Sequence, residues 1–101
     1  MLIRVTREHA LRLEVPEDLK RFKLLVEGEI AGEALARVLG EAGRLEGGHV
    51  WISPDWLRRA SGLAGDAGWQ AGFAKMVEFA AKQGWVNEAG AIRAHIERAG
   101  A

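Results

Sequence analysis

The beginning of the chain alternates between apolar and polar positions. The segments "LIRVT" and "ALRLEV" each place apolar side chains on one side and charged side chains on the other, which is the period of a half-buried β-strand. The residues "REHA" between them are enough for a hairpin connection, although a helical "REHALRL" is an alternative. We therefore expect two short strands paired as a hairpin within residues 2–15.

Residues 16–28, "PEDLKRFKLLVEG", predict a helix. Pro16 suits the first helical position, and the two acidic residues after it suit the positive end of the helix dipole. Leu19, Phe22 and Val26 have the spacing of one helix face. A competing interpretation makes "FKLLV" a strand.

Three further helix patterns and one short strand pattern follow. An apolar stripe predicts a helix over residues 30–43, and "HVWI" at residues 49–52 is rich in strand-forming side chains. Residues 53–62 predict the next helix, because a serine able to cap it precedes proline and aspartate, and a glycine ends it. The clearest apolar stripe of the chain predicts a helix over residues 67–83.

The tail of the chain allows two interpretations. "WV" and "AIRAHI" around the turn "NEAG" predict a hairpin, because Ile92 and the apolar positions after it alternate with Arg93, His95 and Glu97. The alternative is a terminal helix capped by Asn87. The strict alternation favours the hairpin.

Together these elements predict a small, helix-rich α+β protein with a short sheet. From residue 30 onward their order is helix, strand, helix, helix and hairpin, which is the winged-helix-like order. We expect residues 1–101 to form a single domain, in which residues 30–97 are the winged-helix-like unit and residues 1–28 are an N-terminal addition of strand and helix.

Composition narrows the classes of function. Formal charge is balanced, with 14 basic and 14 acidic residues, whereas domains built to hold nucleic acid usually have a basic excess. The absence of cysteine excludes disulfides and thiolate chemistry. Charges near the N-terminus do not fit a signal peptide, and no apolar run has the length of a membrane span. We expect a soluble, cytoplasmic protein with no membrane contact.

No motif predicts catalysis, metal binding or a cofactor. His9, His49 and His95 each lack a second ligand at metal-binding spacing. The glycines of residues 62–72 follow a helix instead of a strand and lack the lysine of a phosphate-binding loop. We therefore assign no catalytic residue, no metal ligand and no cofactor, and lean against an enzyme.

Tryptophan is the unusual feature of the composition, with four residues in a chain that has no tyrosine. Tryptophan and arginine are the side chains most enriched at the centres of protein interfaces. Trp56 with Arg58 and Arg59 is therefore our candidate interaction surface, and Arg93 with His95 adds the exposed side of the expected hairpin.

These observations rank three functions. The first is a non-enzymatic protein–protein interaction domain with a protein partner or a second copy of itself as a homodimer. The second is a winged-helix-type regulator that binds nucleic acid, disfavoured because the outer side of residues 67–83 carries few cations. The third is a small-ligand-binding or enzymatic domain with an aromatic-lined pocket.

Overall fold

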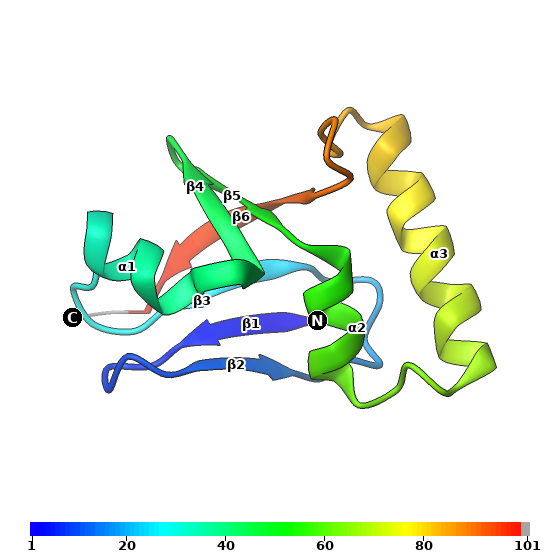
Figure 1. Ribbon diagram of the computed structural model, residues 1–101, viewed down its shortest axis with the longest axis horizontal. Coiled ribbons are helices and arrows are strands. Elements are labelled where there is room, and N and C mark those ends of the chain that lie inside the picture. Colours follow the sequence, from blue (N-terminus) through cyan, green and yellow to red (C-terminus); the bar gives the residue numbers. More distant parts are fainter. Residues whose placement is uncertain (100–101) are drawn as a thin grey trace.

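A single mixed β-sheet runs through the computed structural model, which describes residues 1–99 of the chain (Figure 1). In this described part the six strands are β1 (Leu2–Val5), β2 (Leu11–Glu14), β3 (Lys23–Val26), β4 (Gly43–Glu46), β5 (His49–Ile52) and β6 (Ile92–Arg98). Their order across the sheet is β2-β1-β3-β6-β5-β4. The pairs β1–β3 and β3–β6 are parallel, and the other neighbours are antiparallel. β6 thus joins the first three strands to the β4–β5 hairpin.

The second and third helices begin at side-chain caps, whereas the first has no side-chain cap and is shorter than the predicted helix over residues 30–43. The helices are α1 (Gly32–Leu39), continued by the short 3-10 helix η1 (Gly40–Ala42), α2 (Pro54–Ser61) and α3 (Ala67–Lys82). The Ser53 side chain caps α2 by accepting from the Trp56 N–H, and the Asp66 side chain caps α3 by accepting from the Trp69 N–H. Among the described residues, no helix is both long and apolar enough to cross a lipid bilayer.

One face of the sheet forms the floor of the core. Alternate strand residues on this face are buried, and they are Ile3, Val5, Leu24, Val26, Val50, Ile52, Ile92 and Ala94. The helices cover them with Leu35 and Leu39 of α1, Leu57 of α2 and Phe73 of α3. Figure 1 shows α1 and α2 in front of the sheet, whereas α3 stands at the end where β1 begins. Burial of this apolar area supplies most of the stabilisation.

The opposite face of the sheet is open. We use the name open face for the side chains that point there, which are Leu2, Arg4, Arg12, Glu14, Lys23, Leu25, Arg44, Glu46, His49, Trp51, Arg93, His95 and Glu97. None of them is buried. An antiparallel or mixed sheet with one solvated face gives this alternation of apolar and polar residues along each strand.

The predicted N-terminal hairpin is confirmed, because β1 and β2 pair in antiparallel register. The predicted helix over residues 16–28 is wrong, and the competing strand is correct as β3. β3 lies between β1 and β6, where the ladders on both sides satisfy its backbone and Leu24 and Val26 are buried. The residues before β3 form a loop, in which the Asp18 and Arg21 carbonyls accept from the Met1 amino group.

The tail is a strand, as expected, and not the alternative terminal helix. The expected hairpin is present only next to its turn, where Val86 forms an antiparallel bridge with Ile92 and the Arg93 N–H donates to the Trp85 carbonyl at 2.8 Å. Along its length β6 pairs instead with β3 and β5. β4 was not predicted at all. The α+β class is confirmed, but the chain has more sheet than the helix-rich description, and the winged-helix-like arrangement is not confirmed.

Candidate functional site

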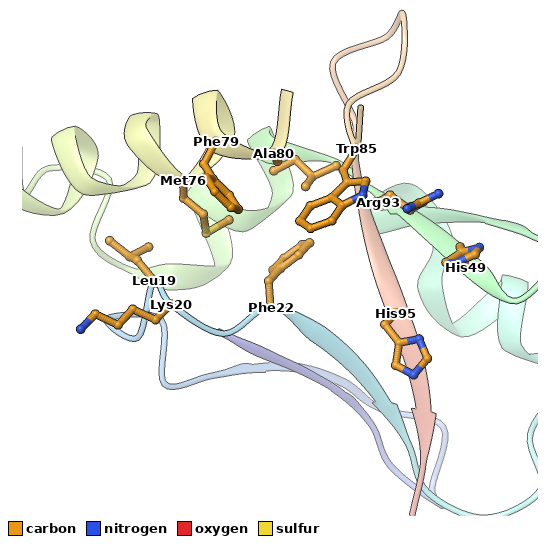
Figure 2. Close-up of a pocket in the computed structure, with 11 residues that line it drawn as sticks. Leu19, Lys20, Phe22, His49, Met76, Phe79, Ala80, Trp85, Arg93 and His95 are labelled. Atoms are coloured by element: carbon orange, nitrogen blue, oxygen red, sulfur yellow. The ribbon is translucent and has the colours of Figure 1, made fainter. Parts of the chain in front are cut away.

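A groove of about 410 Å³ lies between α3, the loop before β3 and the first residues of β6 (Figure 2). We call it the α3 groove. It is lined by Leu19, Lys20, Phe22, His49, Met76, Phe79, Ala80, Trp85, Ile92, Arg93 and His95. Apolar side chains from three separate segments meet cationic and imidazole side chains from the sheet at this one place.

The C-terminal half of α3 supplies one apolar wall. Met76, Phe79 and Ala80 share a helix face because they are three and four residues apart. The chain then turns at Gly84, which has a left-handed φ of 80°, and the Trp85 N–H donates to the Ala80 carbonyl at 2.9 Å. This turn brings the Trp85 ring beside Phe79 in an edge-to-face contact, with 6.1 Å between centroids.

The aromatic pair of Phe79 and Trp85 is unusually open to solvent. The Phe79 side chain is 57% exposed and that of Trp85 is 36% exposed. Large apolar side chains that stay open while grouped at a concave surface mark ligand or partner sites more often than isolated ones do. The pair therefore supplies apolar contact area that the fold itself leaves unused.

The loop before β3 supplies the facing wall through Leu19 and Phe22. This loop is held against α3, because the Trp69 Nε1–H donates to the Pro16 carbonyl at 2.8 Å. Helix and loop approach closely at Gly72, where an added Cβ would lie 2.6 Å from Leu19 Cδ1. A glycine at this helix position thus allows the Leu19 side chain to lie close to the backbone of α3.

The sheet supplies the polar end of the groove. His49 of β5 lies directly opposite His95 of β6, and Arg93 is one outward-facing position nearer to α3. Figure 2 shows the Arg93, His49 and His95 side chains on the sheet side of the aromatic rings, with Lys20 at the other end. No acidic residue is among the described lining residues. The local field in the groove therefore favours anions.

Two cationic side chains that line the groove, Arg93 and Lys20, form no ion pair within the described part of the chain. Within residues 1–99, neither Arg93 nor Lys20 has an acidic side chain within salt-bridge distance. Next to the groove, Lys23 pairs with Glu97 at 2.5 Å. The hydrogen bond from Lys23 holds the pKa of the Glu97 carboxyl below its usual value, and the nearby charge of His95 adds a smaller effect in the same direction.

The residues predicted as an interaction surface are divided between two places. Arg93 and His95 lie at the α3 groove. Arg58 instead lies over the Phe73 ring, 5.1 Å from its centroid, and pairs with an aspartate of its own helix. Arg59 pairs with a glutamate of η1, and Trp56 is half-buried against the core. The structure does not bring these α2 side chains together with those of β6.

Sequence reasoning missed the aromatic wall of the groove. Phe79 lies at the margin of the α3 stripe, where it widens the apolar face beyond what the core needs. Trp85 follows directly after the glycine that ends the helix. The sequence positions of Phe79 and Trp85 therefore already indicated that both rings could lie outside the core. The contribution of Leu19 and Phe22 to the groove could not be predicted from the sequence, because it depends on a loop where a helix was expected.

The ionisable side chains that line the groove are Lys20, His49, Arg93 and His95. Its described lining contains no serine, threonine, aspartate or glutamate able to act as nucleophile or carboxylate base. Among residues 1–99 there is also no group of three or more side chains suited to hold a metal ion. No protein-family model, curated protein or solved structure matches the chain.

Proposed function

We propose that this protein binds a small ligand that has a flat apolar body and a negatively charged group, and that the α3 groove is the binding site. The observation that carries the proposal is the pairing of a solvent-open aromatic wall, Phe79 and Trp85, with a polar end that contains Arg93 and no acid. Aromatic carboxylates and aromatic phosphates have the matching chemistry.

The two halves of such a ligand use different forces. Burial of apolar area gives about 25 cal/mol per Å², and edge or face contacts with aromatic rings add about 0.5–1.5 kcal/mol. The guanidinium of Arg93 fits a carboxylate or phosphate in two parallel hydrogen bonds. Because Arg93 has no ion pair within the described chain, the ligand does not have to displace an internal partner.

A matched pair of ligands tests the proposal. We expect 2-naphthoate to bind about tenfold or more tightly than neutral 2-naphthylmethanol in isothermal titration calorimetry, since a charge-assisted hydrogen bond contributes roughly 1.5–3 kcal/mol. Arg93→Gln should remove this difference, and Phe79→Ser should weaken both ligands. Arg59→Gln, which removes an exposed arginine outside the groove, is the control. Equal affinity of the two naphthalenes, or binding unchanged by Arg93→Gln, would overturn the proposal.

A protein partner, including a second copy of the chain, is the second candidate. The large exposed fraction of Phe79 favours it, because aromatic side chains are enriched at the centres of interfaces. The Phe79→Ser variant separates the two candidates. A drop in mass by light scattering relative to wild type would support self-association through this surface.

A winged-helix type of nucleic-acid recognition has less support. It would use the outer side of α3, where the cations are Lys75 and Lys82. Lys82 lies 3.8 Å from the carboxylate of Glu78. A helix with one acid among so few cations offers little for phosphates or base edges.

A further inference from the structure

Beyond the α3 groove, the open face carries a row of three side chains across three neighbouring strands. Arg44 of β4 lies opposite Trp51 of β5, and Trp51 lies opposite Arg93 of β6. Directly opposed residues in such a ladder have Cβ atoms roughly 4.5–5.5 Å apart. We call these three residues the cross-strand row. It places an aromatic ring between two arginines and starts at the groove.

A second hollow lies at the other end of the cross-strand row. It has a volume of about 650 Å³, and Arg44 and Trp51 are among its lining residues. Its two acids are already engaged, since Asp55 pairs with Arg58 at 2.9 Å and Glu41 pairs with Arg59 at 3.1 Å. The charge of Arg44 is not opposed by an ion pair with any residue of the described chain.

Other cations of the open face differ from those in the row. Arg4 is held by Glu14 at 3.0 Å and by Glu27 at 2.8 Å, and Lys23 is held by Glu97. Cations engaged in this way offer less to an incoming phosphate. Arg12 on the edge strand β2 is unpaired in the described part, but its register partner is Arg4 and not an aromatic residue. The row is therefore the place where free cations and an aromatic side chain coincide.

We infer that the ligand of the α3 groove is a segment of single-stranded nucleic acid that continues over the cross-strand row. This inference rests on the proposed function. One base occupies the groove against Trp85, the backbone phosphates follow Arg93 and Arg44, and Trp51 offers a surface for a second base. Successive strands are about 4.8 Å apart, so the two arginines lie on strands roughly 10 Å apart.

The alternation of aromatic and cationic groups favours nucleic acid over an acidic peptide. Bases stack on aromatic rings while phosphates meet arginines, and such platforms bind single strands with little sequence preference. A duplex keeps its bases stacked inside and cannot use the aromatic wall. With about two phosphate contacts the affinity is modest and should fall about sevenfold between 50 and 200 mM salt, from a slope of roughly −0.7 per contact.

Fluorescence anisotropy with labelled octathymidylate tests the inference, with 2-naphthoate titrated in parallel. We expect Arg44→Gln to weaken binding of the oligonucleotide about tenfold or more, in the range of one charge-assisted contact, and to leave binding of 2-naphthoate unchanged. Arg93→Gln should weaken both ligands. Arg12→Gln, which removes an exposed arginine from the far edge of the same face, should change neither. Arg44 and Arg12 are exposed and unpaired in the described chain, so both variants should fold.

The outcomes separate this inference from the proposed function. If 2-naphthoate binds but the oligonucleotide does not, or if Arg44→Gln leaves the oligonucleotide unaffected, the inference fails and the groove function stands. If a hexaglutamate peptide competes as well as unlabelled octathymidylate, the partner is an acidic protein and the inference fails. If the oligonucleotide depends on Arg44 while 2-naphthoate does not bind, the cross-strand row binds nucleic acid and the small-ligand function fails.

Discussion

Two aromatic clusters lie along α3, and they differ in how exposed their rings are and in what the nearby arginine contacts. In the N-terminal half of the helix, the rings of Trp69 and Phe73 are stacked with centroids 4.9 Å apart, and Arg58 lies over Phe73. We call this the internal cluster. At the C-terminal end, Phe79 and Trp85 make the edge-to-face pair of the α3 groove. The first two rings are 6% and 0% exposed, the second two 57% and 36%.

The comparison teaches that residue types alone do not distinguish an aromatic cluster that stabilises the fold from one that is open to a ligand. Both contain two aromatic rings with an arginine nearby. In the internal cluster, Arg58 is shared between an aromatic face and Asp55, so its interactions are satisfied within the fold. At the groove, Arg93 has no ion pair among residues 1–99. The difference is in burial and partners, which are properties of the folded chain.

The largest expected effect is on the free energy of unfolding, and it distinguishes the internal cluster from the pair at the groove. Phe73→Ala should lower the free energy of unfolding by about 3–5 kcal/mol, because it removes a fully buried ring and leaves a cavity. Phe79→Ala should change it by less than about 1 kcal/mol, because the ring is mostly in water. Urea denaturation followed by circular dichroism measures both. Similar losses for the two variants would mean that Phe79 belongs to the core.

A smaller effect separates the two arginines. Arg58→Ala should lower the free energy of unfolding by about 1 kcal/mol, since it removes a cation–π contact and an ion pair at a partly exposed site. Arg93→Ala should stay within about 0.5 kcal/mol of wild type. The same urea titrations measure both differences. A greater loss for Arg93→Ala would show that this arginine has a structural role.

The smallest effect concerns the pair of Lys23 and Glu97 next to the groove. Because the hydrogen bond from Lys23 lowers the pKa of Glu97, Lys23→Gln should raise that pKa toward its usual value in an NMR titration of the carboxyl carbon. The folded chain holds the lower pKa, so the pair stabilises it at neutral pH, and this contribution disappears as pH falls through the lowered value. An unchanged pKa would mean that the pair does not persist in solution, and Lys23 would then count as a free cation like Arg93.

Local signals in the sequence were sufficient for the elements whose contacts are local. The β1–β2 hairpin, the serine cap of α2 and strand β5 follow from alternation, a capping residue and flanking glycines, and α3 follows from its apolar stripe. β3 was predicted as a helix because Leu19, Phe22 and Val26 have helical spacing in sequence. Its structure depends instead on β1 and β6, one of which lies about 70 residues away along the chain, and non-local pairing overrides local preference.

The candidate site was predictable only in part for the same reason. Arg93 and His95 were identified from their alternation with the apolar residues of the tail. Their neighbours His49 and Phe22 come from other strands or loops, and no spacing along the chain relates them to β6. Strand β4 was missed because "GRLE" is short, begins with glycine and has only one large apolar residue. Edge strands of this kind give a weak pattern.

The central place of β6 has a consequence for how the protein is made. Translation produces β6 after every other strand described here, yet it lies between β3 and β5. A nascent chain that has not reached residue 92 holds two separate groups of strands, each with an unpaired edge where β6 will later insert. Cooperative folding therefore waits for the last strand, and until then each edge is a template for pairing with a neighbouring chain.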